Sequence, residues 1–236
     1  MQRKMWMSLC AAVLLVLGAM LGAANVVSAA EAPPRMRNLG YIWRIDADNV
    51  RGLPRNFRTM EDEFHAPYKK DMDDSYVPTR EGLERLCASG SGEFSESGLQ
   101  SLLEALAEKT QMPICIVDLR EESHGFFDGT AVSWYGEHDW GNVGLTQEEA
   151  LADEAERIHG AAGQMTAVAH LGGEKNPLDE HEIFVEEAQT EKELVEAAGL
   201  RYKRIAATDH IWPSPAAVDE FVQFYKSLPE NIWLHF

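Results

Sequence analysis

Basic residues are scarce in this sequence. Lysine and arginine together number 21 in 236 residues, against 39 aspartates and glutamates, which gives a formal charge of −18 at neutral pH. A protein of this sign repels nucleic acids and anionic membranes, so the composition argues against both as partners. A small anionic substrate is compatible with it, because a local basic pocket can act inside an acidic protein.

Cysteine is also scarce, with three residues in the chain. Cys10 lies in the N-terminal apolar segment, which leaves Cys87 and Cys115 for the body of the protein. In an exported protein these two could form one disulfide bond or remain two buried thiols, and the sequence favours neither. Their spacing matches no template for structural zinc, so no metal is predicted.

Charged residues are absent from positions 5 to 24, and Arg3 and Lys4 precede this apolar run. Small residues follow at Ser28, Ala29 and Ala30, where a signal peptidase would cut. The pattern predicts a signal peptide at residues 1–29 and an exported bacterial protein, periplasmic, cell-surface or secreted, that is free of the membrane after cleavage. An uncleaved membrane anchor is the alternative, because the run is long.

Strand and helix patterns alternate near both ends of the chain, which predicts an α/β fold. The apolar run 113–119 indicates a strand covered on both faces, and leucines at 99, 102, 103 and 106 indicate a helix. Capping boxes begin at Thr146 and Thr190. Residues 121–189 are richer in aromatics, glycine and short strands, and we expect them to form a separate small lobe.

Asp209 and His210 follow a short apolar strand and precede Trp212-Pro213. Proline fixes its own φ and pushes the preceding residue away from helical geometry, so this segment is a rigid loop. It could present an acid beside an imidazole at the mouth of a site, or form a turn in which the aspartate caps the backbone. Ser214 and Pro215 then read as the N-cap and first residue of a helix.

Four arginines gather after the first predicted strand, at positions 44, 51, 55 and 58. Their forked donors suit phosphate oxygens, although a solvated surface is the usual place for such residues. The segment 134–140 combines aromatics with Glu137, His138 and Asp139. Its spacing fits no metal-ligand template, so an aromatic core of the small lobe is favoured over a metal site.

Residues 87–93 mimic the start of a phosphate-binding loop of the form Cys-x5-Arg, in which a thiolate attacks phosphorus. The sixth residue after Cys87 is Glu93, not arginine, and a carboxylate at that place would repel phosphate. No strand clearly precedes the cysteine. We therefore interpret this segment as a surface turn.

Several strings between Tyr41 and Phe236 resemble the protein-tyrosine-phosphatase-like inositol polyphosphatases, or cysteine phytases, of anaerobic gut bacteria. The strings that carry the resemblance are Leu53-Pro-Arg-Asn-Phe-Arg-Thr59, Tyr76-Val-Pro-Thr-Arg-Glu-Gly82, Asp118-Leu-Arg-Glu-Glu-Ser-His-Gly125, Val132-Ser-Trp-Tyr-Gly-Glu137, Arg204-Ile-Ala-Ala-Thr-Asp-His-Ile-Trp-Pro213 and Trp233-Leu-His-Phe236.

The resemblance implies a tyrosine-phosphatase-like α/β domain with a small partial β-barrel lobe. Mapped onto this chain, the α/β domain covers residues 30–120 and 190–236, and the lobe covers residues 121–189. The implied reaction is stepwise hydrolysis of phosphomonoesters of myo-inositol hexakisphosphate through a phosphocysteine, without metal or other cofactor. Inositol polyphosphate is thus the implied partner.

The same resemblance implies roles for single residues. Asp209 occupies the position of the general acid, and His210 that of a substrate contact. Arg44 matches a phosphate-binding arginine, and Asp139 matches an acid that contacts substrate. Lys175 aligns with a phosphate-binding lysine, although the histidine that precedes this lysine in the family is Glu174 here.

In the family, the string Trp-Leu-His-Phe runs directly into His-Cys-x-x-Gly-x-Gly-Arg, which supplies the nucleophile. The sequence ends at Phe236, so we expect an N-terminal fragment of a phosphatase whose α/β domain is incomplete and which is inactive by itself. The alternatives are a truncated remnant that at most binds polyanions, and a phosphatase that acts on phosphotyrosine instead.

Overall fold

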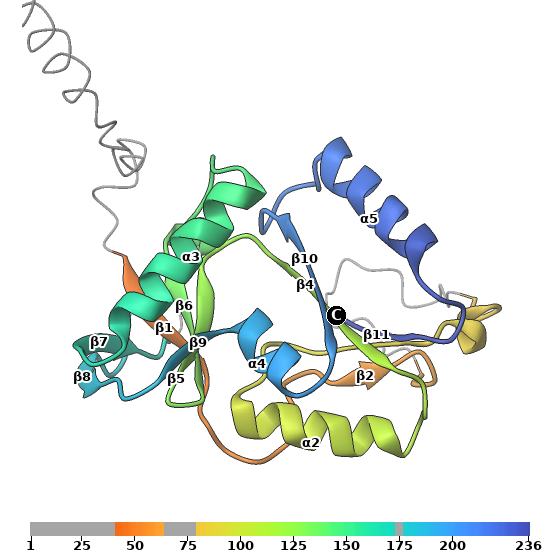
Figure 1. The fold of residues 1–236 in the computed structure, drawn as a ribbon, viewed down its shortest axis with the longest axis horizontal. Coiled ribbons are helices and arrows are strands. Elements are labelled where there is room, and N and C mark those ends of the chain that lie inside the picture. Colours follow the sequence, from red (N-terminus) through yellow and green to blue (C-terminus); the bar gives the residue numbers. More distant parts are fainter. Residues whose placement is uncertain (1–40, 64–78, 173–176) are drawn as a thin grey trace, which may run out of the picture. The chain divides into compact units, whose positions relative to one another are not determined.

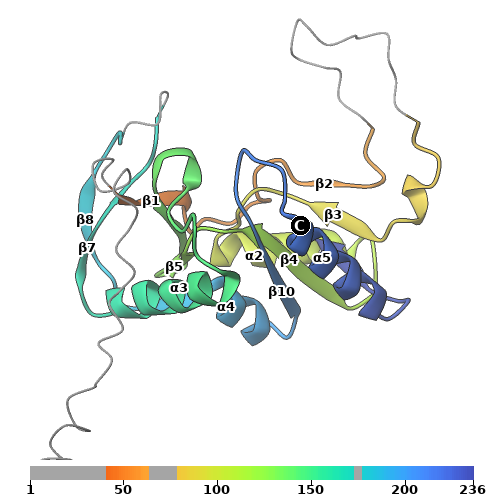
Figure 2. The same ribbon diagram turned by 90° about the horizontal axis from the view of Figure 1, so that it is seen from above.

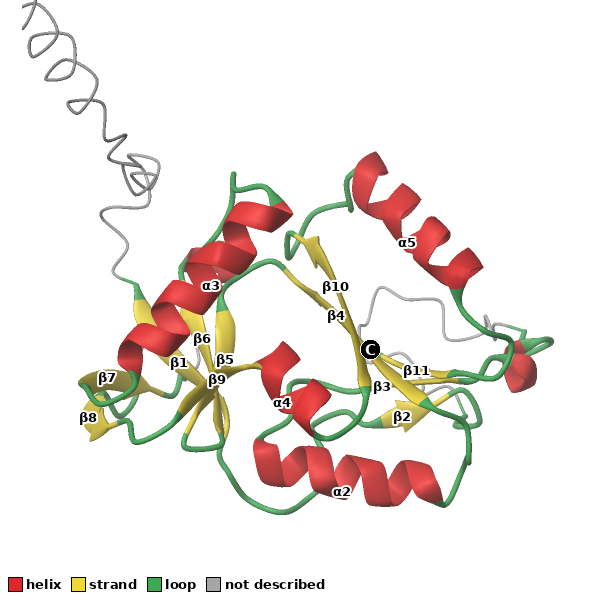
Figure 3. Ribbon diagram, viewed as in Figure 1, coloured by secondary structure: helices red, strands yellow, loops and turns green. Residues whose placement is uncertain are grey.

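The computed structural model describes residues 41–63, 79–172 and 177–236, which lie in a compact unit from Leu39 to Phe236. The predicted signal peptide lies outside these residues. Two mixed sheets and several helices form the fold, so the α/β class predicted from the sequence is confirmed (Figure 3).

A five-stranded sheet has the order β10-β4-β11-β3-β2 (Figure 1). The first four strands of this order run parallel, and β2 pairs antiparallel with β3 at the edge. Parallel strands place their carboxyl ends at one edge of the sheet, which is where α/β proteins usually bind ligands. The strands are β2 (Arg58–Thr59), β3 (Ala88–Gly90), β4 (Ile114–Arg120), β10 (Arg201–Ala207) and β11 (Trp233–His235).

Helices cover both faces of this sheet. Successive side chains of β4 point to opposite faces, so its apolar residues pack against helices on both sides. Ile116 packs with α2 (Glu96–Ala107), whereas Cys115 and Val117 pack with Phe224 of α5 (Pro215–Ser227). Figure 1 accordingly shows α2 and α5 on opposite sides of β4.

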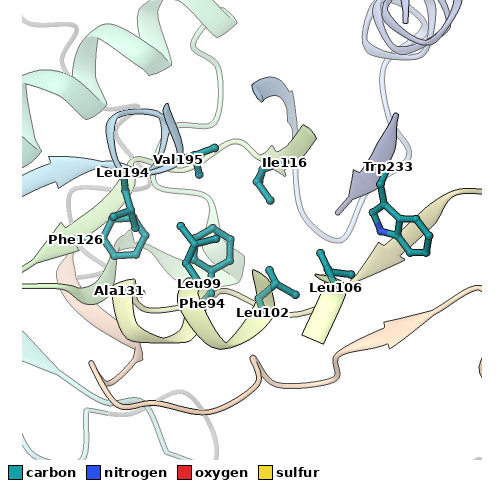
Figure 4. Close-up of a cluster of buried hydrophobic side chains, with 10 residues drawn as sticks. All are labelled: Phe94, Leu99, Leu102, Leu106, Ile116, Phe126, Ala131, Leu194, Val195 and Trp233. Carbon is teal, nitrogen blue, oxygen red and sulfur yellow. The ribbon is translucent and has the colours of Figure 1, made fainter. Parts of the chain in front are cut away.

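The main core lies on the α2 side (Figure 4). Leu99, Leu102 and Leu106 fall on one stripe of α2, and the last two are fully buried. Each buried leucine contributes about 1.5–3 kcal/mol relative to an exposed one. Strands β4, β5 (His124–Phe127) and β11 and the helix α4 (Glu191–Ala197) contribute further side chains to this core: Ile116, Phe126, Trp233, Leu194 and Val195.

The six-stranded sheet has the order β8-β7-β1-β6-β5-β9, with β1 and β7 parallel and the other pairs antiparallel. No pairing of described residues joins β8 to β9, so no closed barrel is found among them. Helix α3 (Gln147–Ala161) packs on it through Ile158. The strands are β1 (Ile42–Ala47), β5 (His124–Phe127), β6 (Thr130–Tyr135), β7 (Met165–Ala169), β8 (His181–Phe184) and β9 (Ala188–Thr190).

Two short 3-10 helices, Leu83–Arg85 and Glu137–Asp139, complete the described elements. The view in Figure 2 shows α3 and α4 beside the six-stranded sheet and β10 close to α5. Within the described ranges, no helix has the length and apolar character needed to cross a bilayer.

The interpretation of residues 87–93 as a surface turn is wrong. Residues 88–90 form β3, and Ser89 within it is buried between β11 and β2. Alanine, serine and glycine give no apolar periodicity, so this strand depends on its neighbours and not on its own sequence. Cys87 and Cys115 are both free thiols, and burial raises the pKa of Cys115 to about 11.

Candidate functional site

The carboxyl ends of the parallel strands β4 and β10 border a polar cavity of about 410 Å³. Four of the five predicted site residues line it: Arg44, Asp139, Asp209 and His210. They come from β1, from the turn after β6 and from the loop after β10, so the fold brings together residues up to 166 positions apart in sequence (from 44 to 210). Lys175, the fifth, lies outside the described residues.

Arg44 and Asp139 form an ion pair in the cavity wall. The guanidinium NH1 lies 2.6 Å from Asp139 Oδ1, and Nε donates to Asp46 Oδ1 at 2.5 Å. Burial opposes the charge of Arg44, but the carboxylates of Asp46 and Asp139 raise its pKa. Burial also raises the pKa of Asp139, against the lowering effect of Arg44. The Arg44 side chain is therefore fixed by two carboxylates and remains positively charged in the cavity wall.

Asp209 and His210 are more exposed, with 51% and 56% of their side chains accessible. Asp209 Oδ1 accepts a hydrogen bond from the His210 backbone N–H at 2.9 Å, and Oδ2 lies 3.2 Å from His210 Nε2. His210 has φ of 61°, a left-handed conformation that non-glycine residues seldom adopt outside functional or tightly constrained sites. Asp209 is therefore a solvent-accessible carboxyl in the wall of the cavity.

Arg120 is a cavity residue to which the sequence reasoning gave no role. Its guanidinium donates to Glu93 at 2.6 Å, to Asp46 at 3.0 Å and to Glu122 at 2.8 Å. Burial opposes its charge, but these three carboxylates raise its pKa well above the usual value. Its position two residues after Asp118, at the end of a buried strand, was the signal that could have indicated it.

The predicted arginine cluster is divided by the structure. Arg44 and Arg55 line the cavity described above, whereas Arg58 lines a neighbouring cavity of about 280 Å³. Arg51 instead pairs with Glu104 at 2.5 Å on an exposed surface. The two cavities are neighbours, because they share the lining residues Glu93, Leu119 and Arg120. Three of the four clustered arginines therefore line these two neighbouring cavities.

His235 lies in the wall of the neighbouring cavity. Its Nδ1 is 2.9 Å from Ser89 Oγ, and its Nε2 is 3.1 Å from Ser91 Oγ. Burial, and then the charge of Arg58, lower the pKa of His235 to about 4. The ring is therefore neutral at neutral pH and orders the two serine hydroxyls.

Glu93, His124 and Glu191 place one potential metal ligand each within 4.8 Å of one another. His124 Nε2 lies 2.9 Å from Glu191 Oε2 and 3.2 Å from Asp118 Oδ2. Arg204 NH1 lies 2.9 Å from the same Asp118 oxygen and 3.5 Å from that imidazole nitrogen. Because arginine already supplies the positive charge here, the group fits an internal ion-pair network better than a cation site.

Arg120 and the Asp209–His210 pair lie at the carboxyl ends of two parallel strands, and Arg44 reaches the same cavity from the six-stranded sheet. Fold and site thus define an α/β protein with a charged cavity at the carboxyl edge of its parallel strands. A family model for PTP-like phytases, described by the substrate name inositol hexakisphosphate, matches residues 117–236, half of the chain. The chain belongs to the PTP-like phytase family.

Solved structures agree with this assignment. A tandemly repeated protein tyrosine phosphatase like phytase from Mitsuokella multacida is 48% identical, with a TM-score of 0.77 over 84% of this chain and 34% of that chain. The PTP-like myo-inositol phosphatase from the same organism, in complex with myo-inositol-(1,3,4,5)-tetrakisphosphate, has the same identity and coverage and a TM-score of 0.75. A PTP-like phytase from Bdellovibrio bacteriovorus is 27% identical, with a TM-score of 0.57 over 84% of this chain and 61% of that chain.

A curated relative, the effector protein hopD2 of Pseudomonas syringae pv. tomato, is 34% identical over 118 residues. The alignment covers 48% of this chain and 25% of the relative. The chain thus spans about a third of the length of the Mitsuokella structures and about a quarter of hopD2.

Proposed function

We propose that the protein containing these residues hydrolyses phosphomonoesters of inositol polyphosphates, with inositol hexakisphosphate as its substrate. The observation that carries the proposal is the convergence of Arg44, Asp139, Asp209 and His210 on one cavity. The family assignment and the inositol tetrakisphosphate complex of a 48% identical phosphatase support this class of substrate.

In the proposed reaction, a cysteine thiolate attacks phosphorus and the bond from phosphorus to the inositol oxygen breaks. Asp209 gives its proton to that leaving oxygen. The resulting carboxylate then takes a proton from water, which attacks the phosphocysteine and releases inorganic phosphate. The nucleophile is the cysteine that follows Trp-Leu-His-Phe in the family, and the residues of this chain supply the acid and the anion contacts.

Arg44, Lys175 and His210 are the proposed phosphate contacts, and Asp139 is proposed to contact substrate while it orients Arg44. The ion pair of Arg44 and Asp139 supports this division, because it fixes the forked donor of Arg44 at the cavity. We also propose export, on the signal-peptide pattern of residues 1–29. The domain boundaries given by the resemblance are proposed with one change, because β1 pairs with β6 and β7 and so belongs to the small lobe.

The test is phosphate release from inositol hexakisphosphate by the protein expressed from its whole reading frame. Asp209→Asn should lower kcat by roughly 10²- to 10⁴-fold, because the amide cannot donate the proton, while affinity for the substrate stays within a few-fold. Asp219→Asn, on the exposed side of α5, is the matched control and should keep full activity.

Undiminished release by Asp209→Asn would remove Asp209 from the reaction, and no release by the unchanged protein would overturn the proposed activity. Faster turnover of phosphotyrosine peptides than of inositol phosphates would show that phosphotyrosine is the preferred substrate. If calorimetry detected binding of inositol hexakisphosphate but no phosphate were released, the protein would bind the compound without hydrolysing it.

A further inference from the structure

The turn after β6 touches the loop that carries Asp209. The indole Nε1 of Trp140 donates a hydrogen bond to the backbone carbonyl oxygen of Asp209, with a distance of 3.0 Å. Trp140 follows a strand of the six-stranded sheet, whereas Asp209 follows a strand of the five-stranded sheet. The bond therefore connects the proposed acid to the opposite sheet.

The turn that presents Trp140 has a constrained backbone. His138 and Asp139 are both left-handed, each with φ of 62°, and the Asp139 N–H donates to the Gly136 carbonyl at 3.0 Å. A Cβ added to Gly141 would collide with the carbonyl oxygen of Trp134, so the chain lies directly against β6 there. The indole thus projects from a backbone that has little freedom to move.

His138 of the same turn reinforces the contact. Its ring centroid lies 5.0 Å from that of Trp140 and 5.8 Å from that of His210, in an edge-on arrangement with the latter. Both members of the Asp209–His210 pair are therefore contacted from this turn, one through its backbone and one through its ring.

The turn also holds the proposed phosphate-binding arginine, because Asp139 lies between His138 and Trp140 and pairs with Arg44. A second bond from the same connection reaches β10, where Gln147 Oε1 accepts from the Ala206 N–H at 3.0 Å. One short segment, residues 138–147, thus contacts the acid-bearing loop, the strand before it and the arginine.

We infer that Trp140 is a positioning residue for the reaction, which holds the backbone of Asp209 so that its carboxyl faces the phosphate bound at Arg44. The inference rests on the proposed function. The indole takes no part in proton transfer, because it donates its hydrogen bond to the backbone carbonyl of Asp209 and not to the carboxyl group.

The test replaces Trp140 by phenylalanine, which keeps an aromatic ring beside His138 and removes the N–H. In the protein expressed from its whole reading frame, kcat for inositol hexakisphosphate should fall roughly 10-fold, the effect of about one lost hydrogen bond, with KM changed less than about twofold. Backbone amides of residues 208–212 should exchange hydrogen faster by a similar factor. Trp134→Phe, the same change on the neighbouring strand, should alter neither quantity by more than about twofold.

The exchange measurement does not depend on turnover. If the unchanged protein released no phosphate, the proposed function would fail, and unchanged exchange at residues 208–212 would separately overturn the anchoring. Faster exchange with an unchanged kcat would also overturn the inference, since the anchor would then have no catalytic consequence. A third outcome is that kcat of Trp140→Phe falls only in proportion to a loss of folded protein, while Trp134→Phe loses neither. Trp140 would then stabilise the fold without positioning Asp209, and the inference would be overturned.

Discussion

At the scale of single residues, Arg204 is a charged group buried inside the fold. Its side chain is 3% exposed, and NH1 lies 2.9 Å from Asp118 Oδ2 and 2.8 Å from Glu154 Oε2. Its NH2 donates to the carbonyls of Glu121 and Glu122. Burial works against ionisation of Asp118, but Arg204 and then His124 keep its pKa well below the usual range. One side chain thereby joins β10, β4 and α3.

Arg204→Met should lower the free energy of unfolding by about 3–5 kcal/mol, because the buried carboxylates of Asp118 and Glu154 lose the guanidinium that pairs with both. Urea unfolding followed by circular dichroism measures this change. Arg201→Met, on an exposed position of the same strand, should cost no more than about 0.5 kcal/mol. Equal effects of the two substitutions would show that the buried network contributes no special stability.

At the scale of elements, two helices begin with the capping box that their sequences predicted. In α3, Thr146 Oγ1 accepts from the Glu149 N–H at 3.3 Å, and Glu149 Oε2 accepts from the Thr146 N–H at 2.8 Å. Thr190 and Glu193 do the same at the start of α4. Thr146 directly precedes Gln147, whose side-chain oxygen accepts a hydrogen bond from the Ala206 N–H of β10. The start of α3 therefore contacts the strand that leads to Asp209.

Thr146→Ala should cost about 1 kcal/mol of stability, because an N-terminal amide of α3 loses its acceptor. Thr146→Ser retains the hydroxyl and should stay within about 0.5 kcal/mol of the original protein. Thermal or urea unfolding of both variants gives the comparison, and an alanine variant as stable as the serine variant would contradict a stabilising role of the cap.

At the scale of the whole molecule, the excess of acidic groups extends into the interior. Burial, together with the nearby charges of Glu93 and Asp118, raises the pKa of Glu191 to about 8. Burial also raises the pKa of Glu93. A carboxyl whose pKa is higher in the folded state stabilises the fold fully below its unfolded pKa. That contribution is lost as the pH rises through the folded value.

The free energy of unfolding should therefore fall between about pH 4.5 and pH 8 relative to that of Glu191→Gln, which stays neutral. The difference should reach about 2–4 kcal/mol at pH 8. Urea unfolding across this pH range measures it. Glu196→Gln, exposed on the same helix, serves as the control. Parallel stability curves for Glu191→Gln and the original protein would exclude this residue as a source of pH dependence.

Local sequence determined much of the fold. Leucine spacing placed α2, capping boxes placed the starts of α3 and α4, Ser214-Pro215 placed α5, and the apolar run at 113–119 placed β4. These signals work because helix caps and apolar periodicity act between residues a few positions apart. The strings of the resemblance also indicated the family from the amino-acid sequence alone, and the family is confirmed.

Other features depended on contacts between distant segments. Residues 88–90 became a strand because β2 and β11 pair with them, and β1 joined the six-stranded sheet through β6 and β7. The bond from Trp140 to Asp209 had no local signal, and only the fold places Arg120 in the lining of two cavities. Sequence determines what each segment prefers, whereas hydrogen bonds between strands and burial of charged groups depend on which distant segments the fold brings together.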